Sequence, residues 1–175
     1  MKYLFLVIGL LAACSPSANK LIEEGKSDYK IFVADSAAAP EQYAAKELQK
    51  YLEKVSGCLL EITHEAKPAA KLIYVGFKGA PESLLKNLQP KDFGKEEYII
   101  RSAEGQLLIA GGAPRGTLYG VIGYLSDHLN CRWYTREVIK TPEQRTITLG
   151  KIEDRQHPVF LYREAWYREA YDPEW

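Results

Sequence analysis

The residues with the most evident chemical potential lie in a glycine-rich turn, Gly111-Gly112-Ala113-Pro114-Arg115-Gly116, which precedes a helical pattern. Backbone N–H groups at the start of a helix attract anions, so such a turn can cradle a phosphate. The dinucleotide fingerprint is not met, because Ala113 occupies the place of its second glycine, and the lysine of a P-loop is absent. The turn is therefore predicted to be scaffold. Its glycines would allow close helix–sheet packing, and Arg115 would pair with a carboxylate or a carbonyl.

A second candidate is Arg163, which is expected to bind substrate at the end of the apolar run 159–162. Its planar guanidinium can hold a carboxylate or sugar hydroxyls. The aromatic faces that follow it suit sugar rings, and they belong to Trp166, Tyr167, Tyr171 and Trp175. The alternative is an ion pair between Arg163 and Glu164 or Glu169.

Other reactive side chains form no recognisable catalytic set. Two carboxylates hydrolyse a glycosidic bond only at a fixed separation within a walled cleft. No remaining sequence builds such walls around the terminal acidic cluster, which consists of Glu164, Glu169 and Asp172. No i, i+4 pairing and no H-E-x-x-H motif, the usual signs of zinc, involves His64, His128 or His157. We therefore expect no catalytic residue, no metal and no cofactor in this chain.

The first residues predict a lipoprotein signal peptide over residues 1–13. Lys2 is followed by an apolar run of about 11 residues, too short to cross a bilayer as a helix. The run ends in Leu11-Ala12-Ala13-Cys14. Small residues before a cysteine are what lipoprotein processing requires, so Cys14 is the expected lipidation site. The alternative is an ordinary secretory signal that contains a cysteine by chance.

Acyl chains on Cys14 would anchor the protein firmly in a membrane. Residues 14–27 are then expected to form a lipidated polar tether, because they show no hydrophobic period. The expected location is the bacterial cell envelope. That compartment permits a disulfide between Cys58 and Cys131, each of which lies just beyond a predicted helix. Two unpaired, half-buried thiols are the favoured alternative.

Composition narrows the possible partners. The chain has 175 residues, with 23 basic and 23 acidic side chains and a formal net charge of zero. No basic stripe is present for nucleic acid. A hydrophobic content of 46% and a charged content of 26% are typical of one packed domain.

Two amphipathic helices and several short strands are expected. The first helix begins near Pro40, with an inner face of Ala44, Leu48, Leu52 and Val55. The second begins near Pro114, with an inner face of Leu118, Ile122, Leu125 and Leu129. Strands are predicted at 29–33, 59–63, 72–75, 97–101, 106–110, 132–134 and 145–149, and a short helix at 81–88. This order indicates an α/β fold, an α+β sandwich in which both helices cover one face of a mixed β-sheet.

These segments resemble, in order and spacing, the N-terminal domain of bacterial α-glucuronidases, which is similar to a domain that precedes the barrel of hexosaminidases. The resemblance covers roughly residues 29–162. The segments that carry it are Ala44–Leu52, Val55-Ser56-Gly57, Ile73–Gly76, Ile109–Gly112, Pro114–Gly120 and Cys131–Tyr134.

The resemblance implies an accessory domain over residues 28–152, with two roughly parallel helices packed on one face of the sheet. In that family the catalytic carboxylates lie on a following (β/α)₈ barrel of some 250 residues. Residues 153–175 would be a linker and the start of that barrel. In the hexosaminidase branch an arginine after a Pro-x-Phe-x-x run contacts the sugar. Arg163 matches that position, with Glu164 where glycine is expected next.

We therefore expect the non-catalytic N-terminal domain of a lipid-anchored glycoside hydrolase, in a chain truncated before its catalytic barrel. The substrate would be polysaccharide or a uronic-acid-containing glycan. The expected partners are that glycan, reached through the missing barrel, and the membrane, with no nucleic acid. The alternative is a self-sufficient glycan-binding or structural lipoprotein of the envelope.

Overall fold

The longest element is helix α1, Ala39–Ser56, in a computed structural model that describes residues 19–67, 70–135 and 137–160. At its start the carboxylate of Glu41 accepts the N–H of Ala38 at 3.2 Å. It ends at Gly57, whose φ of 75° is readily adopted by glycine and whose N–H donates to a carbonyl of the last turn. Its buried face consists of Ala44, Ala45, Leu48, Tyr51, Leu52, Val55 and Ser56. The predicted inner face of this helix is confirmed.

A six-stranded sheet forms the centre of the domain, in the order β10-β5-β6-β4-β2-β3. Strands β3, β2, β4 and β6 are parallel to one another, while β5 is antiparallel to both β6 and β10. The expected mixed sheet is confirmed. Its strands are β2 Lys30–Phe32, β3 Ile62–Thr63, β4 Leu72–Val75, β5 Tyr98–Ala103, β6 Gln106–Gly111 and β10 Glu153–Gln156.

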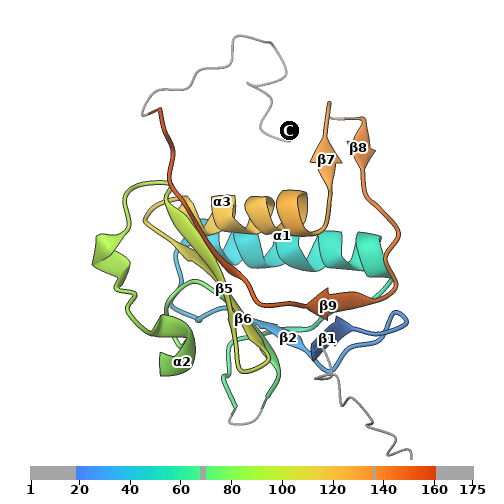
Figure 1. The fold of residues 1–175 in the computed structure, drawn as a ribbon, viewed down its shortest axis with the longest axis horizontal. Coiled ribbons are helices and arrows are strands. Elements are labelled where there is room, and N and C mark those ends of the chain that lie inside the picture. Colours follow the sequence, from blue (N-terminus) through green and yellow to red (C-terminus); the bar gives the residue numbers. More distant parts are fainter. Residues whose placement is uncertain (1–18, 68–69, 136, 161–175) are drawn as a thin grey trace, which may run out of the picture.

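Two helices cover one face of this sheet. Helix α3, Gly116–Gly123, packs beside α1 and runs in the same direction (Figure 1). The apolar core lies between the two helices and the sheet, with Leu48, Ile73, Ile109 and Val121 among its members. A smaller cluster on the opposite face includes Phe32, Tyr74 and Leu108. It is covered by α2, Glu82–Leu85, which is followed by the short 3₁₀ turn η1, Pro90–Asp92.

Helix α3 meets the sheet through small residues rather than large ones. A Cβ at Gly120 would lie 3.0 Å from Ile109 Cγ2, and one at Gly123 would lie 2.5 Å from the Tyr98 hydroxyl oxygen. The inner face predicted from apolar spacing is therefore wrong in part. Leu118 and Ile122 are only half-buried, whereas Leu125 and Leu129 are buried as expected. The helix continues as a π-helical turn, η2, Tyr124–His128.

The expected tether contains a strand. β1, Asn19–Ile22, pairs antiparallel with β9, Ile147–Leu149. Leu21 and Ile22 are both 0% exposed. The expectation of a polar tether through residue 27 is therefore wrong from Asn19 onward. Two apolar residues suffice for a strand here because β9 supplies the hydrogen-bonding partner.

The domain also extends beyond residue 152, where the linker was expected to begin. β10 pairs with β5 along its whole length, from Glu153 opposite Arg101 to Gln156 opposite Tyr98. None of its residues is apolar. Its side chains instead form ion pairs, with Arg101, His128 and Glu97 as the partners of Glu153, Asp154 and Arg155. Ion pairs, rather than burial of apolar side chains, therefore hold this strand on the sheet.

A small hairpin projects from the ends of the helices (Figure 1). It consists of β7, Arg132–Trp133, and β8, Ile139–Lys140. Trp133 Nε1 donates to the Tyr51 hydroxyl at 2.7 Å, which fastens the base of the hairpin to α1. Across residues 19–67, 70–135 and 137–160, no helix combines the length and the hydropathy that crossing a bilayer requires.

Replacing Ile22 tests whether β1 belongs to the folded domain. Ile22→Ala removes a fully buried side chain, so we expect it to lower the free energy of unfolding by about 2–4 kcal/mol in chemical denaturation. Lys20→Ala, on the exposed face of the same strand, is the matched control and should change it by less than about 0.5 kcal/mol. If Ile22→Ala and Lys20→Ala both have small and equal effects, β1 is part of the tether and not of the folded domain.

Candidate functional site

The N-terminal ends of both helices lie at the carboxyl ends of the parallel strands, which is the usual place for a ligand in an open α/β sheet. Here that place is taken by the chain itself. The Thr117 hydroxyl accepts the N–H of Gly111 at 3.1 Å and donates to Glu41 Oε1 at 3.4 Å. The other Glu41 oxygen accepts the N–H of Ala38. An internal carboxylate therefore occupies the position in which a bound anion would sit.

The glycine turn is packed too closely to admit a ligand. A Cβ placed on Gly111, Gly112 or Gly116 would come within 3.0 Å of backbone atoms, a separation that real Cβ atoms essentially never show. For Gly112 those atoms belong to Phe93 and Gly94. The N–H of Gly112 donates to the Glu97 carbonyl oxygen at 2.8 Å. The predicted scaffold role of this turn is confirmed.

The environment of Arg115 also agrees with the prediction. Its guanidinium pairs with the carboxylate of Glu96 at 2.9 Å. It therefore does not extend an anion site at the start of α3. Pro114 precedes the helix, and the Ala113–Pro114 peptide bond is cis. Helix α3 begins two residues after this proline, at Gly116.

Glu97 connects the glycine turn to the last strand. One of its carboxylate oxygens accepts the N–H of Gly94 at 2.8 Å, and the other accepts Arg155 Nε at 2.7 Å. Burial alone would raise the pKa of Glu97. The hydrogen bond from Gly94 and the Arg155 guanidinium outweigh burial and hold the pKa below its ordinary value. Glu97 is therefore ionised and paired at neutral pH.

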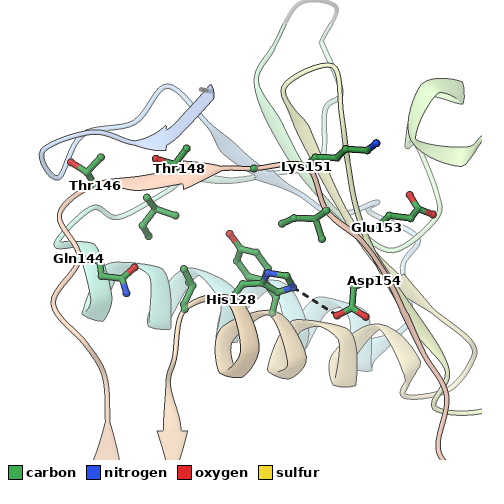
Figure 2. Close-up of a pocket in the computed structure, with 12 residues that line it drawn as sticks. His128, Gln144, Thr146, Thr148, Lys151, Glu153 and Asp154 are labelled. Atoms are coloured by element: carbon green, nitrogen blue, oxygen red, sulfur yellow. Dashed lines mark ion pairs between the residues drawn. The ribbon is translucent and has the colours of Figure 1, made fainter. Parts of the chain in front are cut away.

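An open groove of about 580 Å³ lies between η2 and the segment that joins β9 to β10 (Figure 2). Its buried apolar lining includes Tyr124, Leu129 and Ile147. Burial raises the pKa of the Tyr124 hydroxyl, which stays protonated. Figure 2 shows His128 and Asp154 facing each other across the groove, with 3.8 Å between His128 Nε2 and Asp154 Oδ2. The His128 ring also stacks on Tyr124, with 5.4 Å between ring centroids.

The acidic residues of the groove do not form a hydrolytic pair. Glu153 and Asp154 are adjacent on a strand, so their side chains point to opposite faces of the sheet. Glu153 is bonded to Arg101, and Asp154 faces His128. What the groove offers is a set of hydrogen-bonding groups above an apolar base, which suits a polar ring of the size of a sugar. Its polar groups include Gln144, Thr148, His128 and Asp154.

Sequence reasoning did not find this groove, since its residues come from η2, β9 and β10 and share no local motif. Several predicted residues lie outside the described residues: Cys14, Arg163, Glu164, Glu169 and Asp172. Their expected roles stay predictions.

The two remaining cysteines are unpaired, as favoured. Cys131 is buried and Cys58 half-buried, and burial raises the pKa of both thiols, so neither is set up as a nucleophile. Within the described part of the chain, no group of three or more metal-ligating side chains comes together. His64, for example, contacts the Val33 carbonyl oxygen at 2.9 Å.

Gly112→Ala tests the packing of the glycine turn. Because the added Cβ meets backbone rather than a flexible side chain, we expect the free energy of unfolding to fall by about 3 kcal/mol or more. Gly150→Ala is the matched control, since nothing lies within 4 Å of its Cβ position. If both variants unfold at the wild-type denaturant concentration, the scaffold role is wrong.

Glu97→Gln tests the lowered pKa. A carboxyl group with a depressed pKa adds stability above its unfolded-state value, near 4.3, and loses it as pH falls through the folded value. Wild-type protein should therefore lose more stability than the variant between pH 7 and about pH 3. The control is Glu104→Gln at an exposed turn. Parallel pH profiles for wild type and Glu97→Gln would contradict the assignment.

Solved structures of larger proteins contain regions similar in fold to this chain. A family GH115 4-O-methyl-α-glucuronidase, described as specific for decorated arabinogalactans, matches 76% of this chain with a TM-score of 0.55 and 20% identity. A β-hexosaminidase of Streptomyces plicatus matches 78% with a TM-score of 0.44 and 18% identity. This chain spans 18% and 23% of the lengths of those proteins. Among curated protein sequences, none matches it.

A family model gives the more specific result. The model of the glycosyl hydrolase family 67 N-terminus matches residues 17–124, which is more than half of the chain. The matched residues include β1, both sheet-covering helices and the glycine turn. The chain belongs to the glycosyl hydrolase family 67 N-terminal family.

Proposed function

We propose that this chain is the non-catalytic N-terminal domain of a lipid-anchored glycoside hydrolase that acts on polysaccharide or uronic-acid-containing glycans. The family match over residues 17–124 is the observation that carries the proposal. The GH115 4-O-methyl-α-glucuronidase with the same fold, of which this domain would be less than a fifth, supports a larger parent enzyme. Hydrolysis would then take place on a separate (β/α)₈ barrel.

The lipid anchor is supported by the sequence Leu11-Ala12-Ala13-Cys14 after a short apolar run. Cleavage before Cys14 and acylation of its thiol and amine would place the protein on a membrane of the bacterial cell envelope. Arg163 lies three residues beyond the last described residue, and in the parent enzyme it would contact the sugar.

The domain's role would be to support the barrel. The β7–β8 hairpin and the end of β10 extend beyond the helix layer on the same side of the molecule (Figure 1). Both carry exposed apolar side chains, Tyr134 and Val138 on the hairpin and Val159 and Phe160 after β10. Exposed apolar side chains of this kind can contribute to an interface. This side is where the chain leads out of the sheet, so the occupant would be the barrel.

The coding sequence after codon 175 tests this function directly. We expect it to encode a barrel of some 250 residues in frame. The joined protein should release a uronic acid from a glucuronoxylan or a decorated arabinogalactan, whereas residues 15–175 alone should not. A stop codon with no barrel, or hydrolysis by residues 15–175 alone, would contradict the proposal.

The groove beside His128 favours a second candidate, a self-sufficient glycan-binding lipoprotein. Its base is apolar, its lining groups form hydrogen bonds, and its volume of about 580 Å³ accommodates a sugar ring. Calorimetric titration of the purified chain with glucuronic acid and with xylo-oligosaccharides would show saturable heat that His128→Ala abolishes. The absence of heat with folded protein would reject this candidate.

A further inference from the structure

The position of β1 limits how the domain can sit on a membrane. β1 begins at Asn19, with only four residues between it and residue 14, and its Leu21 and Ile22 are fully buried. The family match also begins at residue 17, before this strand. Only residues 15–18 therefore separate Cys14 from the first strand of the domain.

The reach of that segment decides the orientation. Five Cα–Cα steps span at most about 18 Å. A domain of roughly 140 residues has a diameter of about 35–40 Å. Asn19 thus cannot be carried to the side of the domain that faces away from the anchor. A tether that ran to residue 27 would reach about 45 Å, which is enough for the domain to turn in any direction.

The chain leaves the domain on the other side. Figure 1 shows β1 at the lower right of the view and the end of β10 at the upper left, beyond the helix layer. The turn of the β5–β6 hairpin lies with β1, because a Cβ at Gly105 would be 3.2 Å from Asn19 Nδ2. Val159, in contrast, is 82% exposed on the exit side.

The surface around β1 carries basic and acidic side chains together, with no basic excess among Lys20, Glu23, Glu24, Lys26, Asp28 and Lys71. Lys20 pairs with Glu23, Lys71 with Asp28 and Lys30 with Glu61. Binding to anionic headgroups depends on an excess of basic side chains. The acyl chains would therefore bind the protein to the membrane, and the short segment between Cys14 and Asn19 would set the orientation of the domain.

We propose that the β1–β9 end of the domain faces the lipid bilayer and that the domain acts as a spacer. Polypeptide after Phe160 would then begin about 35–40 Å farther from the membrane, where extended glycans outside the headgroup region are accessible. This inference rests on the proposed acylation of Cys14.

Energy transfer to a fluorescent lipid tests the orientation. The acylated full chain, with Cys58→Ala to leave only buried Cys131, would carry a donor dye at Glu104→Cys or at Val159→Cys. It would be reconstituted in vesicles of phosphatidylethanolamine and phosphatidylglycerol that contain rhodamine-labelled phosphatidylethanolamine. We expect several-fold stronger transfer from position 104 than from position 159. Ten Gly/Ser residues inserted between Ala18 and Asn19 should remove most of that difference.

The possible outcomes distinguish a missing anchor from a wrong orientation. Equal transfer from the two positions in the uninserted chain would overturn the orientation even if Cys14 is acylated. Unmodified Cys14 in the intact mass of protein extracted from membranes would overturn the anchor, and the orientation with it. Residues 15–175 carrying no acyl group should stay unbound to the same vesicles. Binding that disappears at high salt would instead show an adhesive protein surface and overturn the spacer.

Discussion

The fold depends on the close approach of two backbones, the glycine turn after β6 and the segment that leads into β5. At Gly111, Gly112 and Gly116 the two backbones lie so close that a Cβ atom would not fit between them. The N–H of Gly112 donates a hydrogen bond to the carbonyl oxygen of Glu97. This contact fixes where α3 begins and brings Glu97 into reach of Arg155 on β10. The close contact of uncharged backbone therefore also positions the charges that hold the last strand.

Close packing continues along α3, where glycines rather than leucines face Tyr98 and Ile109. Gly120 and Gly123 allow the helix to lie near the sheet, and larger residues such as Ile122 remain half-exposed on its other sides. The same principle accounts for the start of the helix, where Thr117 and Glu41 satisfy backbone and side-chain groups that are hidden from water.

Much of the fold could be predicted because local sequence patterns determine α1 and the β5–β6 hairpin. The apolar residues of α1 recur at helical spacing, and the hairpin has a glycine turn between two apolar runs. β1 and β10 could not, since each is stabilised by a partner far away in the chain: β9 for one, and Arg101, His128 and Glu97 for the other. The spacing of large apolar residues also predicted the wrong inner face for part of α3. Glycines form the face that contacts the sheet, and a pattern of large apolar residues does not include them. At the site, the scaffold role of the glycines was readable, whereas Glu41 gains its role only through tertiary contact.

β10 also affects how molecules of this protein associate. It is the edge of the six-stranded sheet, and an edge strand with free backbone groups invites pairing with a strand of another chain. Glu153, Asp154, Arg155 and Gln156 make such pairing unfavourable, because a second strand would have to desolvate or repel these side chains. The same charges that hold β10 in place thus protect this edge of the sheet from pairing with another molecule. An apolar sequence here would have secured the strand at the expense of solubility.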